Sequence, residues 1–174
     1  MPAKQSNNRN KVKKLCLYSI FCAVCMVLGY VEALLDLSFI APGVKIGLAN
    51  TIACVLIVYG DLKGAFAVNV SRILLSALIF GSFISLAFAL SAGLASMAAM
   101  YLAVRIKRFS VVGISIIGGV VHNVIQCAVG LIFTGRGVVY YLPVLLVLGV
   151  VCGALTGIIS NLVLIRIKKE DKNV

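Results

Sequence analysis

The feature that most constrains this chain is the long stretch from Gly64 to Val104, in which Arg72 is the one charged residue. As a single helix this stretch would be roughly 60 Å long, about twice the hydrocarbon thickness of a bilayer. It must therefore fold back on itself, and Gly81-Ser82-Phe83 is the predicted turn because glycine and serine favour turns. Because 62% of the residues are hydrophobic and 12% are charged, we expect an integral membrane protein with short loops.

The other apolar runs extend this pattern to six membrane-spanning helices, each near the roughly 20 residues that a crossing requires. The predicted spans are Leu15–Leu35, Val44–Gly60, Gly64–Ser82, Ser85–Val104, Val111–Phe133 and Tyr141–Ile165. We therefore predict an all-α bundle. Residues 15–165 form its membrane domain, residues 1–14 a basic N-terminal tail and residues 166–174 a basic C-terminal tail.

The basic residues are distributed unevenly between the two sides of this bundle. With a cytoplasmic N-terminus, the outer side receives Lys45 and Arg136, and Arg72 lies within the membrane. The inner side receives the other basic residues, which are Lys4, Arg9, Lys11, Lys13, Lys14, Lys63, Arg105, Lys107, Arg108, Arg166, Lys168, Lys169 and Lys172. The positive-inside rule therefore predicts that both termini are cytoplasmic. Basic charge in these positions does not indicate binding to nucleic acid.

The six cysteines all lie inside apolar runs, so a disulfide framework is not expected. Cys22 and Cys25 have the spacing of a redox motif, but on a lipid-embedded helix we interpret them as small packing residues. The chain has a single histidine, His122, which would need carboxylates from elsewhere to hold a metal ion. We expect no metal site and no other cofactor.

The stretch from Ala41 to Asn50 brings polar groups to the edge of the second span. Pro42 cannot continue a helix and Gly43 lets the backbone turn, so the chain returns into the membrane here. Lys45 is then placed at the membrane edge, and Asn50 lies roughly 7 Å deeper. A turn with an interfacial lysine explains this pattern structurally. The functional alternative is a ligand site, because polar groups in a bilayer usually face a cavity or a partner helix.

Arg72 is the costliest residue to bury, and Asn69 lies on the same helix face three positions earlier. Three kinds of partner are open to this guanidinium. The first is the carboxylate of Glu32, at the outer end of the first span. The second is a set of carbonyl and amide groups, and the third is an anionic ligand.

The fifth span carries a second polar group, with His122 and Gln126 four residues apart on one face and Asn123 beside them. The structural explanation is hydrogen bonding between helices. However, Glu32, Lys45, Asn50, His122 and Gln126 all fall in the middle to outer half of the membrane. Their convergence favours a pocket that opens outward.

The last span has a row of small residues, Gly149, Gly153 and Gly157, at intervals of four. Such a row lets another helix approach closely, so we interpret it as a packing groove and not as a ligand contact.

These motifs resemble the Gx transporter family, which is also labelled heptaprenyl diphosphate synthase component I. The resemblance lies in Pro42–Asn50, Arg72, Gly113-Ile114-Ser115-Ile116, His122-Asn123-Val124-Ile125-Gln126 and Tyr141-Leu142-Pro143. It implies a six-helix bundle like the substrate-binding (S) components of energy-coupling factor transporters. It also implies the plasma membrane of a bacterium, where members often accompany a flavin-based extracellular electron transfer system.

The synthase label conflicts with the acidic residues of the chain. Prenyl diphosphate synthases share aspartate-rich motifs that hold magnesium and diphosphate, whereas Asp36, Asp61 and Asp171 are isolated here. We therefore expect that the protein is not an enzyme.

Our leading functional prediction is a substrate-binding, S-component-like transport protein that captures a small anionic or amide-bearing solute from the outer side. The predicted substrate-binding residues are Glu32, Lys45, Asn50, Asn69, Arg72, His122, Asn123 and Gln126. Besides membrane lipid, the resemblance implies an energy-coupling ATPase and T-component module or a small extracytoplasmic redox partner. Two alternatives remain open. One is a non-transporting membrane subunit of a flavin-based extracellular electron transfer complex that handles quinone or flavin, and the other is an accessory membrane subunit of heptaprenyl diphosphate synthesis.

Overall fold

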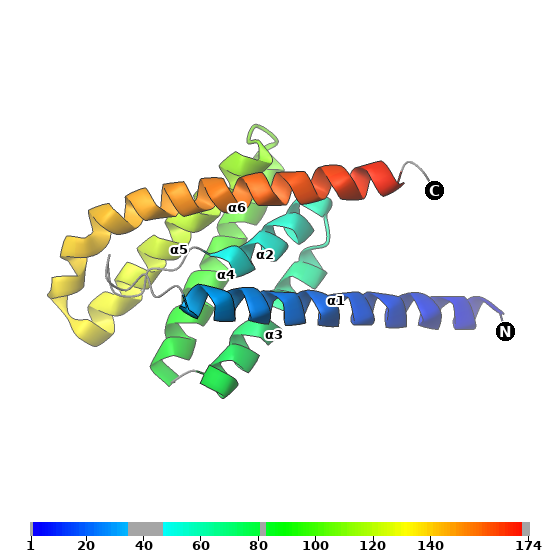
Figure 1. Cartoon of the computed structure of the whole chain (residues 1–174), viewed down its shortest axis with the longest axis horizontal. Coiled ribbons are helices and arrows are strands. Elements are labelled where there is room, and N and C mark those ends of the chain that lie inside the picture. The colour runs from blue at the N-terminus through cyan, green and yellow to red at the C-terminus, as the bar shows by residue number, and fades with distance from the viewer. Residues whose placement is uncertain (1, 35–46, 81–82, 172–174) are drawn as a thin grey trace.

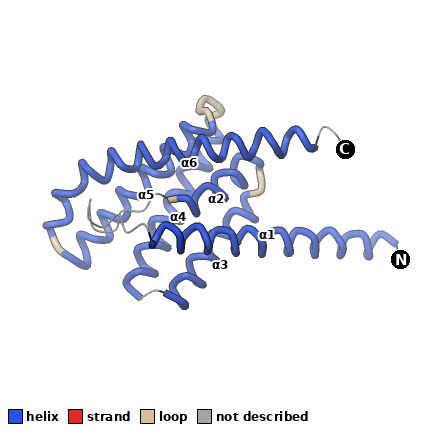
Figure 2. The backbone as a smooth tube through the Cα atoms, viewed as in Figure 1, coloured by secondary structure: helices blue, strands red, loops and turns tan. Residues whose placement is uncertain are grey.

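The computed structural model describes residues 2–34, 47–80 and 83–171, and within these ranges every regular element is a helix (Figures 1 and 2). The elements are α1 (Pro2–Leu34), α2 (Leu48–Tyr59), α3 (Leu62–Phe80), α4 (Phe83–Ile106), α5 (Val111–Thr134), the 3-10 helix η2 (Arg136–Tyr141) and α6 (Leu142–Asp171). The prediction of an all-α membrane bundle is confirmed.

Five of the described helices, α1, α3, α4, α5 and α6, are long and apolar enough to cross a membrane. The chain turns back between α3 and α4, as the length of the uncharged stretch requires; Gly81 and Ser82 of the predicted turn lie outside the described residues. The sixth helix, α2, has 12 residues and is therefore about 18 Å long, which is short of the hydrocarbon thickness. Residues 44–46, which begin the predicted second span, also lie outside the described part of the chain.

The short helix α2 is the centre of the bundle. It packs against α1, α3, α4, α5 and α6, and it buries Ala49, Thr51 and the run Ala53–Ile57. Gly60 ends it with a φ of 99°, a left-handed conformation that glycine adopts without steric cost. A helix surrounded by protein in this way has little contact with lipid, so it does not need the length of the outer helices.

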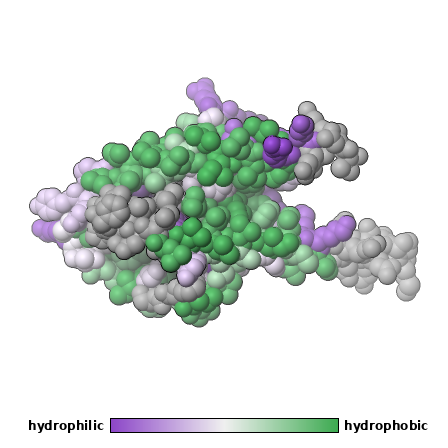
Figure 3. Space-filling model, viewed as in Figure 1, coloured by the Kyte–Doolittle hydropathy of each residue, from purple (hydrophilic) through white to green (hydrophobic). Residues whose placement is uncertain are grey.

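The outer helices present the apolar surface expected of a membrane protein. Leu78 and Phe83 are each 83% exposed and Ile132 is 80% exposed, which suits contact with lipid. In Figure 3 apolar side chains cover the flanks of the visible helices, and hydrophilic side chains gather towards helix ends. The start of α1 and the end of α6 lie at the same end of the bundle, and η2 lies at the opposite end (Figure 1). The basic segment before the first predicted span is helical too, because α1 already begins at Pro2.

Helices α5 and α6 touch through their backbones. A Cβ atom added to Gly153 would lie 2.7 Å from Ile116 Cα, and one added to Gly157 would lie 2.7 Å from Val112 Cα. A Cβ on Gly149 would lie 3.1 Å from the Gly119 carbonyl oxygen. The glycine row of the last span therefore lies along its contact with α5, at distances that leave no room for a side chain.

A polar cluster joins α1 to the connection between α2 and α3. The Tyr18 hydroxyl donates to Asp61 Oδ2 at 2.5 Å, and the Gly64 N–H donates to Asp61 Oδ1 at 3.0 Å. Burial raises the pKa of Asp61, but these two hydrogen bonds and the charge of Lys14 outweigh it and lower the pKa below its ordinary value. Asp61 thus caps the start of α3 as a carboxylate.

Candidate functional site

The N-terminus of α2 lies inside the bundle and is bound by a carboxylate from α1. Gly47 has a φ of 83°, and its N–H donates to Glu32 Oε1. Glu32 is buried at 7% exposure. The Asn50 N–H donates to the Gly47 carbonyl at 2.8 Å and so forms the first turn of the helix. This turn places the Asn50 side chain among the surrounding helices.

Arg72 of α3 meets two of the amides that the sequence singled out. Its Nε donates to Asn69 Oδ1 at 3.0 Å, and its Nη2 donates to Asn50 Oδ1 at 2.8 Å. Asn69 in turn donates to Met97 Sδ at 3.1 Å, and Glu32 adds an electrostatic attraction to Arg72. Amide groups are thus the direct partners of this guanidinium, with a carboxylate as a further source of compensation.

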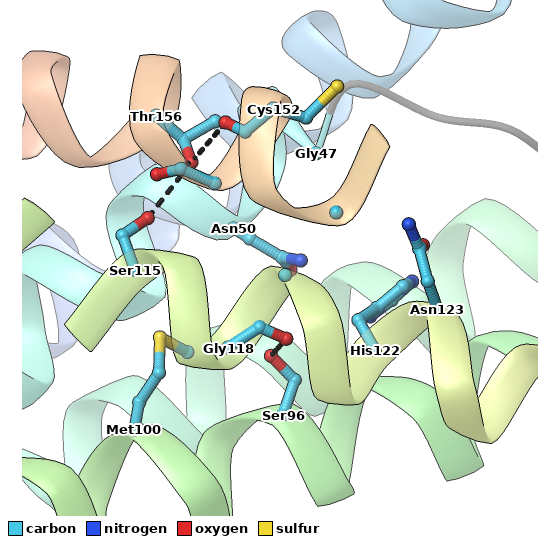
Figure 4. A pocket seen from close by; sticks show the side chains of 13 residues that line it. Gly47, Asn50, Ser96, Met100, Ser115, Gly118, His122, Asn123, Cys152 and Thr156 are labelled. Carbon is cyan, nitrogen blue, oxygen red and sulfur yellow. Dashed lines mark hydrogen bonds between the residues drawn. The ribbon is translucent and has the colours of Figure 1, made fainter. Parts of the chain in front are cut away.

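A small polar cavity has Asn50 in its lining, and Arg72 is not among the residues that line it (Figure 4). Its volume is about 30 Å³, which is room for one or two water molecules. Its walls come from α2, α4, α5 and α6, and the lining residues are Gly47, Asn50, Ser96, Met100, Ser115, Gly118, Gly119, His122, Asn123, Gly149, Cys152, Gly153 and Thr156.

Hydrogen bonds between helices hold the walls of the small cavity together. Ser96 of α4 donates to the Gly118 carbonyl of α5 at 2.8 Å. The hydroxyls of Ser115 and Thr156 lie 2.9 Å apart and join α5 to α6. Figure 4 shows both bonds at the edge of the space that His122 and Asn123 face. Hydroxyl side chains of this cavity therefore join α4 to α5 and α5 to α6.

A second cavity, much larger, lies where η2 joins α5 to α6. Its volume is about 610 Å³. The lining residues are Ser85, Phe88, Ala89, Gln126, Cys127, Gly130, Thr134, Gly137, Val138, Tyr141 and Leu145. Most of these side chains are apolar, and the Gln126 side chain makes no hydrogen bond with any other residue that the structure describes. This cavity is large enough for an organic molecule with several rings or a short chain.

The predicted site residues are therefore divided among several positions. Asn50, His122 and Asn123 share the small cavity, whereas Gln126 lines the large one. Arg72 and Asn69 lie on α3, where Arg72 donates to both Asn69 and Asn50. Glu32 accepts from the Gly47 N–H at the start of α2. Lys45 lies outside the described residues.

Sequence reasoning missed the residues of the large cavity other than Gln126, and also Ser96, Ser115 and Thr156 of the small cavity. Phe88, Thr134 and Tyr141 have ordinary residue types for the ends of membrane helices. Ser85 and Ala89 are small residues one turn apart at the start of α4, a pattern that lets another helix or a ligand come close. The sequence does not show which of the two comes close.

A hydrogen bond across the α5–α6 contact joins a residue of the small cavity to a residue of the large one. Asn123 Nδ2 donates to the Leu145 carbonyl at 2.7 Å; Asn123 lines the small cavity and Leu145 the large one. The Cys127 thiol lies 3.7 Å from the Val138 carbonyl and links α5 to η2. Among the residues that the structure describes, no three His, Cys, Asp or Glu side chains are grouped so as to hold a metal ion.

Comparison with known proteins identifies the family. No curated protein and no solved structure matches the chain. The profile of one protein family, described as heptaprenyl diphosphate synthase component I, matches residues 21–163, which include all the membrane helices from within α1 to within α6. The chain therefore belongs to the heptaprenyl diphosphate synthase component I family.

Proposed function

We propose that this chain is a solute-binding membrane protein, which captures a small molecule on the outer side and catalyses no reaction itself. The large cavity carries this proposal. Its volume of about 610 Å³ falls within the range of roughly 300–1,000 Å³ that is usual for small-molecule sites, and such sites combine an apolar wall with a few polar groups.

The proposed orientation places both termini in the cytoplasm of a bacterium. It rests on the positive-inside rule, because the basic residues of the sequence concentrate in its tails and in the connections after α2 and α4. η2, at the other end of the bundle, then faces outward (Figure 1). The large cavity lies beside η2, in the half of the protein that an external solute meets first.

The lining of the large cavity favours a solute with a neutral, largely apolar body. None of the described residues that line it is charged, and a charged group placed there would lose its hydration without a partner. Gln126 offers both an amide donor and an amide acceptor, and Ser85, Thr134 and Tyr141 offer hydroxyls. An amide-bearing or carbonyl-bearing solute fits this lining better than one with a charged body.

The proposed mode of action is that of an S component, which binds the solute while a separate ATPase and T-component module supplies the energy. The small-residue positions Ser19 and Ala23 of α1 line a groove between α1 and α3, where a partner helix has room to pack. Purification in mild detergent tests this proposal: recovery of an ATPase supports transport, whereas recovery of a redox protein or quinone supports a role in extracellular electron transfer.

A second candidate, an accessory subunit of prenyl diphosphate synthesis, is favoured by the description of the family and by the apolar lining of the large cavity. Such a subunit would hold an isoprenoid chain for a soluble catalytic partner. Capture of that partner by the membrane protein from detergent extracts supports this role, and its absence from the eluate removes it.

Uptake by reconstituted vesicles tests solute binding directly. Vesicles with the protein, incubated with a small-molecule extract of cells and then washed, should retain a compound that empty vesicles do not retain. Gln126→Leu keeps the side-chain size but removes the amide, so retention should fall about three- to tenfold, as expected for one lost hydrogen bond. Equal retention by empty vesicles, or by the variant and the wild type, would contradict the proposal.

A further inference from the structure

The two cavities follow one another along the contact between α5 and α6. His122 and Asn123 line the small cavity, and Gln126 and Cys127, one helical turn later, line the large one. A helical turn advances by about 5.4 Å. On α5, the layer between the two spaces is therefore about one helical turn thick.

That layer contains the hydrogen bond from Asn123 to the Leu145 carbonyl. Leu145 lies within α6, so its carbonyl oxygen also accepts a bond from the backbone of its own helix, and a carbonyl has two lone pairs. Rotation of the Asn123 side chain away from Leu145 thus leaves no backbone group of α6 unsatisfied.

Arg72 determines which groups Asn50 presents to the small cavity. Because Arg72 Nη2 donates to Asn50 Oδ1 at 2.8 Å, the amide oxygen is turned towards Arg72 and the Nδ2 donors point away from it. Figure 4 shows the Asn50 side chain reaching towards the part of α5 that carries Gly118 and His122. A group in the small cavity therefore meets N–H donors on Asn50, backed by a positive charge.

We propose that the two cavities are two compartments of one ligand site. The apolar body of the ligand occupies the large cavity, and a hydrogen-bond acceptor at its end, a carbonyl or carboxylate oxygen, enters the small cavity when Asn123 turns away from Leu145. This inference rests on the proposed function and narrows its solute to a compact apolar molecule with an acceptor at one end.

Thiol labelling tests the partition between the compartments. Ser96 is 2% exposed and lines the small cavity, so the thiol introduced by Ser96→Cys reports on that compartment, and the native Cys127 reports on the large one. Protein in lipid nanodiscs is treated with methyl methanethiosulfonate, and peptide mass spectrometry gives the rate at each cysteine. Cys152, which also lines the small cavity, is a second reporter that does not require Ser96→Cys.

Asn123→Ala, introduced into the Ser96→Cys protein, should raise the labelling rate in the small compartment about three- to tenfold, the factor expected for the loss of one hydrogen bond. The labelling rate of Cys127 should stay unchanged. Ser160→Ala is the matched control, because it removes a hydrogen bond between α6 and α2 and lines neither cavity. An unchanged reporter rate would overturn the proposal. An equal rise in Ser160→Ala, or a parallel rise at Cys127, would also overturn it, since either indicates a general loosening of the helices.

A pair of two-ring probes tests the need for an acceptor. 2-Acetonaphthone carries a ketone, and 2-isopropylnaphthalene is a hydrocarbon of similar shape; 2-naphthoate distinguishes a carboxylate from a ketone. All three should slow labelling of Cys127, but only the probes with an acceptor should slow labelling of the small compartment, about threefold or more. Asn50→Leu should abolish the difference between the acceptor-bearing probes and the hydrocarbon in protection of the small compartment.

Equal protection of the small compartment by ketone and hydrocarbon, or no protection by any probe, would overturn the two-compartment site. The vesicle experiment tests the proposed function separately from the two-compartment site. If no compound is retained by the vesicles but the labelling pattern is as expected, the transport function is wrong and the connected cavities remain.

Discussion

Replacing Gly153 with alanine tests whether contact between the backbones of α5 and α6 holds this bundle together. The added Cβ would lie 2.7 Å from Ile116 Cα, and ordinary contact begins at 3.4 Å, so α5 must move away by about 0.7 Å. Enlarging a side chain in a packed interior costs about 1–3 kcal/mol, because the neighbouring backbone cannot relax freely. Gly153 also lines the small cavity, so the same movement alters its wall.

Gly29→Ala is the matched control, because Gly29 lies within α1 and an added Cβ meets nothing within 4 Å. Both substitutions gain the same helix propensity, about 0.5–1 kcal/mol, and only Gly153→Ala creates a clash. We therefore expect Gly153→Ala to be less stable than Gly29→Ala by about 1–3 kcal/mol. Unfolding in mixed detergent micelles, followed by far-ultraviolet circular dichroism, measures this difference in a chain that has no tryptophan. If Gly153→Ala is as stable as the control, the backbone-contact explanation is refuted.

Arg72→Leu should destabilise the protein by about 1.5–3 kcal/mol in the same assay, because it removes the charged donor of two hydrogen bonds in a partly buried polar network; a loss below about 1 kcal/mol would show that the network contributes little. Gly64→Ala should also be destabilising, because its Cβ would lie 2.6 Å from Tyr18 Cε1, and a stability equal to the wild type would contradict the described packing. Because hydrogen bonds lower the pKa of Asp61 below its ordinary value of 3.8 despite burial, which raises it, its stabilisation is present above that value and is lost as the pH falls through the lower folded pKa. The difference in unfolding free energy between the wild type and Asp61→Asn should therefore be constant from pH 7 to about pH 5 and narrow below pH 3.8; a difference already lost at pH 5 would exclude a lowered pKa.

The main features of the fold could be predicted from hydrophobic length alone. The uncharged stretch from Gly64 to Val104 is too long for one crossing, and α3 and α4 indeed divide it. The length of α2 could not be predicted in the same way. Its position at the centre of the bundle depends on packing against five other helices, and the apolar composition of a segment does not distinguish contact with protein from contact with lipid.

The candidate site was predictable only where a local rule applied. Asn69 and Arg72 are three residues apart on α3 and do form a hydrogen bond. The contact between Arg72 and Asn50 depends on the relative position of two helices, which spacing along one helix does not give. Similarly, His122 and Gln126 share a face of α5, but η2 and the start of α6 create a separate cavity beside Gln126.

Native mass spectrometry of the purified protein tests the central claim most directly, which is that the large cavity binds a small molecule. Ala89 lines this cavity on α4, so Ala89→Phe fills it, whereas Ala128 on α5 is exposed and Ala128→Phe leaves it open. We predict one retained small molecule per chain in the wild type and in Ala128→Phe, and its loss in Ala89→Phe. A wild-type protein with no retained molecule, or one that Ala89→Phe retains equally well, would contradict the account.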